Sequence, residues 1–449
     1  MRPELLGGLL ARSLQRHRVS HWKGALIVYR LLGVVALMFI GCGQRITSPS
    51  TPEEARSSLA RDTSPAAPAA DVASVVDGNT AFAFALHRQL VSPGQNLMTS
   101  PYSVSLALGM TYVGARGETA TQLASALHFA LPADRFAPAL DAIDLALMTP
   151  AACVFPPCAP FSLRLANAAW AQKGLSLEPT YLDTLARSFG VGVKLADFRT
   201  AAEPARLAIN QWVAEETEQK IRDLLPAGSV DPSTRLVLVN AVYFKGTWAT
   251  QFDARQTTPS NFTLLGGETT SVPTLHGGLE TRAVTGASFD AVELPYRDSH
   301  FAMLVIVPAR GTFDAFEQSF GPEQLAALDA SLGKREVTLS LPKFSFHWGK
   351  SLVPALTALG LTDAFDASKA DFSGITTAER LFFSDVIHQS YVGVDEIGTE
   401  AAAATAVVLA GASAPGQKVT ITVDRPFLFA IRDTTTGTIA FLGRVVDPR

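Results

Sequence analysis

Residue types that could carry out catalysis do not occur in any recognisable catalytic spacing in this sequence. It contains no H-E-x-x-H zinc motif, no P-loop, no G-x-G-x-x-G behind an apolar run and no G-x-S-x-G elbow. The eight histidines are scattered, and His17 and His21 lie in a basic N-terminal segment. Serine, histidine and aspartate are present, but no local signature arranges them as a triad. We therefore predict that the protein is not an enzyme and needs no cofactor or metal.

One stretch near the C-terminus, "DEIGTEAAAATAVVLAGASAPG" (395–416), mixes signals for different conformations. Its alanine run favours a helix that Thr399 would cap, whereas its second half is β-branched and then rich in Gly, Ser and Pro. An ordinary helix is one interpretation. However, the apolar run 407–410 has no helical period, and Gly398 precedes the segment as a natural hinge. Taken alone, the tract supports an ordinary helix and a segment without one settled conformation equally.

The composition indicates a folded protein with a sizeable core. Of the 449 residues, 47% are hydrophobic and 17% are charged, which excludes a disordered chain. Residues 1–41 carry +5 of a formal net charge of −4, so the remainder carries −9. Such a body has no general attraction for nucleic acid or for an anionic membrane surface.

The N-terminus has the pattern of a targeting segment. Basic residues precede the apolar run "LLGVVALMFI", which is too short to span a bilayer but suits a signal peptide. Extending the run back through "ALIVY" gives a longer stretch interrupted by Arg30, so a tilted membrane anchor is the alternative. Gly41-Cys42 resembles the lipobox of bacterial lipoproteins, in which the cysteine is lipidated, although Phe39 departs from the usual Leu. A free cysteine beside a secretory signal is the other interpretation.

Residues 43–72 are rich in Ser, Thr, Pro and Ala and predict a flexible tether between the signal segment 1–42 and a single domain, 73–449. The only other cysteines are Cys153 and Cys158, in "CVFPPC". In an exported protein they could close a small disulfide or remain two free thiols. Four nearby ligands for zinc are lacking.

The domain shows both helical and strand-like periodicity, which predicts a mixed α/β fold. Helical spacing occurs in "NTAFAFALHRQLV", "SVSLALGMTYVGA" and "INQWVAEETEQKIRDLL", the last with apolar residues from Ile209 to Leu225 on one side. Strand-like runs are "RLVLVNAVYF", "FAMLVIVP", "EVTLSLPKFSF" and "ITVDRPFLFAIRD".

Several segments, in the same order along the chain, resemble the serpin family of serine protease inhibitors. They are "NLMTSPYSVSLALGMTYVGARGETATQL", "INQWVAEETEQKIRDLLP", "TRLVLVNAVYFKGTWATQFD", "VELPY", "LPKFSF", "ADFSGI", "GTEAAAATA" and "DRPFLFAIRDTTTGTIAFLGRV". The resemblance covers nearly all of residues 75–449. It implies an α+β serpin fold with three β-sheets, eight or nine helices and an exposed reactive-centre loop. It also implies a monomer that forms a covalent acyl complex with its target protease.

The resemblance gives the unusual stretch a function as the reactive-centre loop. In inhibitory serpins the target protease cleaves this loop, which then inserts into the central sheet as an extra strand. Alternate residues would enter the core, and none of them is charged: Thr399, Ala401, Ala403, Thr405, Val407 and Leu409. The opposite face comprises Glu400, Ala402, Ala404, Ala406 and Val408, with its only charge at Glu400. Small residues avoid overpacking when the strand enters.

In the serpin family the hinge glycine, here Gly398, normally lies fourteen residues before the attacked residue, so the resemblance implies that the reactive bond joins Ala412 and Ser413. Ala410 and Gly411 are the next candidates for the attacked residue. A small residue here suits elastase-like or subtilisin-like proteases, because trypsin-like pockets need Arg or Lys. The helix-forming segment "DRFAPALDAIDLAL" has one Arg and three Asp near where some relatives bind polysaccharide, so we expect no heparin-like activation.

The resemblance also implies mechanical roles for five residues of the central sheet. Ser100, Ser103, Asn240 and His388 match positions where the family's strands part, and Trp248 matches a tryptophan near the loop's entry point. Ordinary buried packing is the alternative for each. Two further functions remain open: a non-inhibitory serpin that acts as a carrier or chaperone, and a structural or adhesive envelope lipoprotein.

Overall fold

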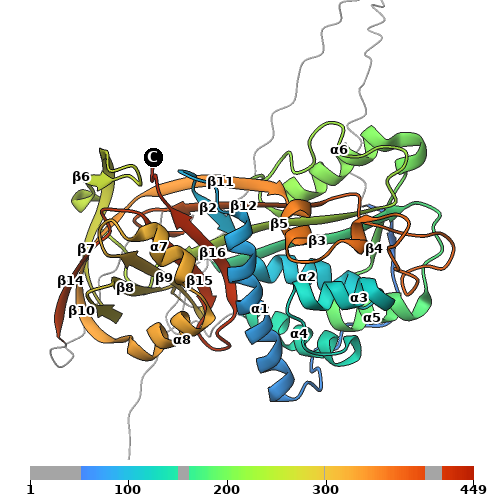
Figure 1. The fold of residues 1–449 in the computed structure, drawn as a ribbon, viewed down its shortest axis with the longest axis horizontal. Helices are drawn as coiled ribbons and strands as arrows, with labels where there is room; N and C mark the ends of the chain where they lie inside the picture. The colour runs from blue at the N-terminus through green and yellow to red at the C-terminus, as the bar shows by residue number, and fades with distance from the viewer. Residues whose placement is uncertain (1–51, 150–160, 298, 400–416) are drawn as a thin grey trace, which may run out of the picture. The chain divides into compact units, whose positions relative to one another are not determined.

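The structure, a computed structural model, describes residues 52–149, 161–297, 299–399 and 417–449, all within the compact unit 51–449. In these ranges the chain forms nine α-helices and sixteen strands arranged in two sheets (Figure 1). The helices are α1 (Ala69–Leu90), α2 (Pro101–Tyr112), α3 (Gly117–Ala126), α4 (Ala133–Met148), α5 (Pro179–Phe189), α6 (Phe198–Glu216), α7 (Phe313–Ser319), α8 (Pro322–Ser331) and α9 (Val353–Ala358). The mixed α/β class that the sequence predicts is therefore confirmed, with nine α-helices among the described residues.

The central sheet has seven strands. In spatial order they are β1 (Glu54–Ala55), β4 (Val193–Ala196), β3 (Phe161–Gln172), β5 (Leu236–Thr247), β13 (Gly398–Thr399), β12 (Val386–Val394) and β11 (Phe344–Ser351). Strand β13 is only two residues long and lies between β5 and β12 at one end of both. Away from that end, β5 and β12 pair directly as parallel strands.

The second sheet has nine strands. In spatial order they are β14 (Lys418–Thr422), β10 (Gly333–Pro342), β7 (Thr269–Thr285), β8 (Phe289–Pro295), β9 (Phe301–Pro308), β15 (Phe427–Asp433), β16 (Ile439–Val445) and β2 (Leu97–Thr99), with β6 (Thr258–Thr263) paired to β7. We expected three sheets in total, and the described residues contain two. The reason is the 17-residue strand β7, which pairs with β10 along one part and with β8 along another, so that two groups of strands become continuous.

The strand-like runs of the sequence form strands, but two of them are divided. The run "EVTLSLPKFSF" supplies β10 to the second sheet and β11 to the central sheet, and Lys343 is the residue between them. The run "ITVDRPFLFAIRD" is divided at Pro426, which has no N–H to donate to a ladder, into β14 and β15.

The helix predicted for "INQWVAEETEQKIRDLL" is shorter than the sequence indicated. Helix α6 ends at Glu216, whereas the apolar pattern predicted helix to Leu225. Glu218 and Gln219 have left-handed backbone conformations, so the helix cannot continue through them. The Asn210 side chain donates to the Leu225 carbonyl (2.9 Å) and accepts from the Leu225 N–H (2.8 Å). These bonds fold the following loop back, so that its apolar residues pack beside α6 as they would have done in a longer helix.

Residues 52–68 differ from the flexible tether that the sequence predicts over 43–72. Strand β1 pairs with β4 at the edge of the central sheet, and α1 begins at Ala69, inside the predicted tether.

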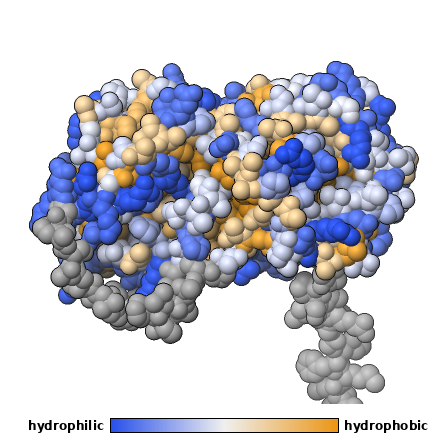
Figure 2. Space-filling view, turned by 90° about the horizontal axis from the view of Figure 1, so that it is seen from below, coloured by the Kyte–Doolittle hydropathy of each residue, from blue (hydrophilic) through white to orange (hydrophobic). Residues whose placement is uncertain are grey.

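The described surface exposes few large hydrophobic side chains. Figure 2 shows hydrophilic and hydrophobic residues intermixed on one face, and Met148 and Leu207 are the exposed large hydrophobic residues among those described.

Candidate functional site

The predicted hinge, at Gly398 and Thr399, follows a tight reversal of the chain at the end of β12. The Asp395 N–H donates to the Gly398 carbonyl (3.0 Å), and Asp395 Oδ1 accepts from the N–H groups of Ile397 (2.8 Å) and Gly398 (3.1 Å). An aspartate that binds backbone N–H groups two and three residues later is a common way to fix a turn. The turn directs the chain back between β5 and β12 as strand β13.

Gly398 occupies a position where the backbones of two strands approach closely. A Cβ atom at this position would lie 2.0 Å from the Gly246 carbonyl oxygen on β5. The sequence predicted a glycine hinge because of its conformational freedom, whereas the structure shows that close backbone approach requires the missing side chain. Any other residue would have to push β13 away from β5.

Thr399 lies where an inserting strand would begin. It pairs with Gly246 on β5 and Val394 on β12, and only 1% of it is exposed. Its Oγ1 atom lies 2.6 Å from the hydroxyl of Tyr296, which follows β8. Burial raises the pKa of Tyr296, so the phenol remains a neutral hydrogen-bonding group. The first core-facing residue of the loop is thus already packed within the sheet.

Trp248 lies beside this hinge, where the resemblance placed it. Its ring stacks on Tyr296 with centroids 4.6 Å apart and an interplanar angle of 16°. Its indole N–H donates to the Asp395 carbonyl (2.9 Å), and its backbone N–H donates to the Ile397 carbonyl (2.8 Å). The tryptophan therefore holds both the turn and the tyrosine that contacts Thr399.

An ion pair fixes the same turn from its other side. Glu396 accepts hydrogen bonds from Lys343 Nζ (2.8 Å) and Thr257 Oγ1 (2.7 Å). Burial raises the pKa of the Glu396 carboxyl, but the bonds from Lys343 and Thr257 outweigh it and hold the pKa below its usual value. Neither Glu396 nor Lys343 was predicted as a site residue, although Lys343 belongs to the "LPKFSF" motif.

The four polar residues predicted for the middle of the sheet lie in one buried network. The Ser100 N–H donates to His388 Nε2 (3.0 Å), and His388 Nδ1 lies against Asn240 Oδ1. Asn240 Nδ2 donates to Ser103 Oγ (2.8 Å) and to Asn167 Oδ1 (2.7 Å). We call these five residues the mid-sheet network. Asn167, on β3, was missed because it lies in an ordinary alternating run.

Within the mid-sheet network, the His388 tautomer follows from its neighbours. Because Nε2 accepts from a backbone N–H, the proton of the neutral ring sits on Nδ1 and is donated to Asn240. Burial lowers the pKa of His388 to about 4. Protonation of His388 would place its Nε2–H against the Ser100 N–H, so that two donors would face each other and the hydrogen bond would be lost. Since Asn240 and His388 are directly paired across β5 and β12, their bond closes this part of the sheet.

The remaining predicted residues lie outside the described part of the chain. They are the reactive bond Ala412–Ser413, the loop residues Glu400, Ala401, Ala402, Ala403, Ala404, Thr405, Val407 and Leu409, the lipidation candidate Cys42 and the pair Cys153 and Cys158. Their roles stay predictions.

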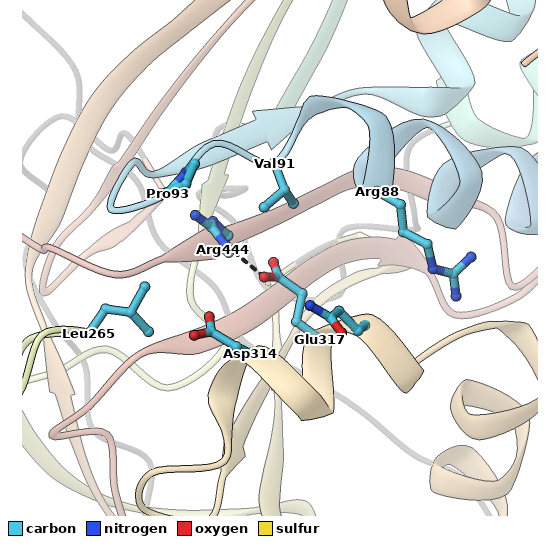
Figure 3. Close-up of a pocket in the computed structure, with 8 residues that line it drawn as sticks. Arg88, Val91, Pro93, Leu265, Asp314, Glu317 and Arg444 are labelled. Carbon is cyan, nitrogen blue, oxygen red and sulfur yellow. Dashed lines mark hydrogen bonds and ion pairs between the residues drawn. The ribbon is translucent and has the colours of Figure 1, made fainter. Parts of the chain in front are cut away.

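A pocket elsewhere is the main alternative site (Figure 3). Its volume is about 420 Å³, and Arg88, Val91, Asp314, Glu317 and Arg444 are among its lining residues. Arg444 is 1% exposed and donates to Glu317 (2.7 Å), which also bonds His87 (2.8 Å). Burial raises the pKa of Glu317, but His87 and Arg444 outweigh it and keep the pKa low. Glu317 of α7 thus bonds Arg444 of β16 and His87 of α1, so we assign these three residues to the stability of the fold.

Two other kinds of site are not found in the described residues. Among them, no group of three or more His, Cys, Asp or Glu side chains is arranged to hold a metal ion. No helix in the described ranges is long and apolar enough to cross a membrane.

Comparisons with known proteins agree with this geometry. The family model "Serpin (serine protease inhibitor)" matches residues 77–448. A serpin-like protein of Thermococcus kodakarensis is 35% identical over 431 residues, covering 93% of this chain and 98% of the relative. The leukocyte elastase inhibitor of Homo sapiens is 35% identical over 387 residues, covering 82% and 98%. The crystal structure of the thermophilic serpin tengpin in its native state superposes with a TM-score of 0.74 at 26% identity, covering 83% and 94%. The chain belongs to the serpin family.

Proposed function

We propose that this serpin inhibits serine proteases by inserting its cleaved reactive-centre loop into the central sheet and thereby trapping the acyl-enzyme. The serine of the target protease attacks the Ala412 carbonyl, the peptide bond to Ser413 breaks, and the Ser413 amine leaves with a proton from the protease, so that Ala412 becomes esterified to the protease serine. Insertion then carries the protease away from the loop's original position before water hydrolyses the ester. From Thr399 to Ala412 is fourteen residues, or about 46 Å at ~3.3 Å per residue, which is enough to displace a tethered protease.

The observation that carries this proposal is the register of Thr399. It joins Gly246 of β5 and Val394 of β12, and each of these lies six residues beyond Asn240 and His388, which face each other. Continuing β13 antiparallel to both strands therefore brings Thr405, six residues after Thr399, between Asn240 and His388. No shift of β5 along β12 is needed. The strands have only to separate sideways.

The chemistry of the entering residues fits the site that they would meet. Thr405 would arrive where the Asn240–His388 bond must break, and its hydroxyl can both donate and accept hydrogen bonds. Buried polar groups would then keep partners after insertion. Thr399, Ala401 and Ala403 are small, so they fit against core-facing residues such as Phe244 and Val242 without large movements.

The proposed targets are elastase-like or subtilisin-like proteases. Ala412 is small, and the preceding residues Leu409, Ala410 and Gly411 carry no charge. A relative with 35% identity is named a leukocyte elastase inhibitor, which supports an elastase-like target. A trypsin-like protease would find no basic side chain at these positions to bind in its specificity pocket.

The test is incubation of the protein with one elastase-like and one subtilisin-like protease, followed by a denaturing gel. We expect a covalent complex that survives denaturation and a cut between Ala412 and Ser413. The matched variant Ala412→Arg should lose these targets and gain trypsin-like ones, because its guanidinium can pair with the carboxylate of their pocket. Cleavage at this bond without any covalent complex would favour the non-inhibitory carrier or chaperone.

We further propose that the protein is exported and held at the cell envelope by a lipid on Cys42. The support is the sequence pattern of residues 1–42. The variant Cys42→Ser should appear in the soluble fraction or remain unprocessed. Unchanged membrane fractionation would contradict lipidation.

A further inference from the structure

The register of Thr399 also decides where Glu400, the next residue of the loop, would lie after insertion. Thr399 pairs antiparallel with β5 on one side and with β12 on the other. The next position in this register lies between Lys245 of β5 and Gly393 of β12. Glu400 is the only charged residue of the stretch 399–416, so the single charge of the loop would arrive beside Lys245.

Lys245 lies on the face of the central sheet on which α6 packs (Figure 1). Side chains alternate along a strand, so Lys245 shares its face of β5 with Val239 and Ala241, which belong to the apolar cluster of α6. Glu400, one residue after the core-facing Thr399, would reach this same face. The side chain of Lys245 is partly buried and forms no hydrogen bond or ion pair with the described residues.

The neighbours of Lys245 across the sheet are small and uncharged. On one side Lys245 faces Ser162 of β3, and on the other side of the entry position Gly393 faces Ser345 of β11. Lys245 is therefore the only charged residue in this row of the described strands β3, β5, β12 and β11. Opposite charges directly across two strands attract, so an ammonium group without a partner in this row is suited to receive one carboxylate.

The other side of the entry position carries a hydroxyl group. A Cβ atom at Gly393 would lie 2.9 Å from the Tyr391 hydroxyl oxygen, so this phenol group lies over the glycine. Lys220 Nζ lies 5.3 Å from the centre of the Tyr391 ring and adds a second positive charge nearby. A carboxylate between Lys245 and Gly393 would thus have an ammonium group on one side and a phenol that can donate a hydrogen bond on the other.

The entry position lies outside the direct pairs of β5 and β12. These pairs end at Tyr243 and Tyr391, and Lys245 lies two residues beyond them, toward the hinge. Glu400 would therefore reach Lys245 before those pairs separate. An attraction at this point acts at the start of insertion and favours entry of the loop over its withdrawal.

The alanine run after Glu400 cannot set its own register. Residues 401–404 are all alanine, and a strand without distinctive side chains specifies its register weakly. A shift of two residues deeper would place Glu400 beside Tyr243, which is 1% exposed, and would bury the carboxylate away from Lys245. A shift in the other direction would leave Lys245 opposite an alanine. Pairing with Lys245 therefore selects the register in which Thr405 reaches the mid-sheet network.

We propose that Lys245 is a docking site for the Glu400 carboxylate, which it binds at the start of insertion, and that this ion pair fixes the register of the entering loop. This inference rests on the proposed insertion function and adds to it a positioning residue on β5. The occupant of the site is the loop of the same chain. Lys245 does not contact the scissile bond, so it acts on the competition between insertion and hydrolysis of the acyl-enzyme.

The first test exchanges the two charges. Each protein is mixed with the elastase-like or subtilisin-like protease that the parent protein traps, and the ratio of cleaved inhibitor to covalent complex is read from a denaturing gel. Lys245→Glu and Glu400→Lys each place like charges opposite each other, so we expect either variant to raise this ratio about 5-fold. The double variant restores the pair in reverse and should return to within about 2-fold of the parent protein. The control Lys350→Gln removes an exposed lysine from β11 and should leave the ratio unchanged.

The second test uses ionic strength and does not need a charge-reversed protein to fold. A partly exposed ion pair is screened by salt, so the ratio for the parent protein should rise about 2-fold between about 0.05 M and about 0.5 M sodium chloride. Lys245→Gln has no pair to screen, and its ratio should start high and stay constant. Because the ratio compares two fates of one acyl-enzyme, it is independent of how fast the protease associates.

The outcomes separate docking from insertion itself. If the parent protein traps the protease and Lys245→Glu traps it equally well, the docking site is overturned while insertion stands. A double variant that is not rescued, or a salt response that persists in Lys245→Gln, has the same meaning. If the parent protein is cleaved without forming a complex and without a rise in melting temperature, the loop does not insert, and both proposals are refuted.

Discussion

The two ends of the contact between β5 and β12 are built differently. At the hinge, β13 already lies between them, and backbone bonds to Gly246, Val394 and the Asp395 turn hold it there. In the middle, β5 and β12 pair directly, and the Asn240–His388 bond closes them. At the hinge, β5 and β12 are separated by β13. At mid-sheet they pair directly, and polar side chains bond across them.

In the proposed insertion, the resistance therefore lies at mid-sheet and not at the hinge. The first core-facing residue, Thr399, needs no further opening, because it is already buried against Tyr296. Each later residue has to break the ladder between β5 and β12. A buried polar network is stable only while its members keep their partners, so the mid-sheet network resists opening until a new partner arrives. We expect substitutions at the hinge to change trapping and substitutions at mid-sheet to change the rate of opening.

The largest effect is expected at the hinge, from Thr399→Arg. Its guanidinium would have to be buried among Tyr296, Gly246 and Val394 without an acidic partner, which costs several kcal/mol. The acyl-enzyme should then hydrolyse before insertion, so that the variant is cut as a substrate. We expect trapping to fall by more than about 100-fold in a gel assay with the target protease. The control Thr399→Ser keeps the hydroxyl and should trap normally; undiminished trapping by the arginine variant would place the hinge register elsewhere.

The next effect is expected at mid-sheet, from Asn240→Ala. Asn240 is fully buried, and its loss leaves the His388 Nδ1–H without an acceptor and opens a cavity. We expect the free energy of unfolding to fall by about 2–4 kcal/mol and conversion to the inserted form to accelerate.

Asn167→Ala is the matched control for that measurement. Asn167 belongs to the same network but makes no bond across β5 and β12, so the Asn240–His388 bond survives its loss. The Asn240→Ala variant should therefore have a lower urea midpoint and a faster conversion rate than the Asn167→Ala variant. If both convert at the same rate, the closure lies elsewhere than in the Asn240–His388 bond.

The sequence predicts the hinge better than its surroundings. Alternation from Thr399 and the glycine at 398 are local features, and the structure places both residues in β13, between β5 and β12. Tyr296 and Lys343 lie far away along the chain, and no local pattern connects them to the hinge. They become recognisable only when the fold brings β8 and the end of β10 beside it.

Residues 53–62 show a structure that the local sequence pattern does not predict. Composition predicts a flexible tether, because Ser, Thr, Pro and Ala without a period have no intrinsic preference for a packed structure. The order comes from partners far along the chain: Arg61 binds Asp141, and Ala55 pairs with Val193. The aspartates of "DRFAPALDAIDLAL" supported only the prediction that a heparin-like polyanion would not bind there. That buried acids need an arginine from another segment cannot be read from that pattern.

Acidic pH should weaken the mid-sheet network through His388. The unfolded chain takes up a proton near pH 6.5, but the folded protein does so only near pH 4. Over that window the unfolded state binds more protons, so the free energy of unfolding falls as the pH falls from 6.5 to 4. We expect a loss of about 2 kcal/mol from this group at pH 5. His388→Gln should flatten that slope, and the exposed His347→Gln should not; equal slopes in all three would assign the acid sensitivity to other groups.

The smallest effect is expected back at the hinge, from Tyr296→Phe. The ring keeps its stacking on Trp248, and only the hydroxyl that contacts Thr399 is lost, so we expect a cost of about 1 kcal/mol. The measurement is hydrogen exchange of residues 397–399, which should speed up about 5-fold while the mid-sheet amides are unchanged. In a Thr399→Val background the tyrosine hydroxyl has already lost this partner, so adding Tyr296→Phe should have little further effect. Effects that simply add in the double variant would show that the bond between the two hydroxyls does not hold β13 in the sheet, and that the turn at Asp395 does so alone.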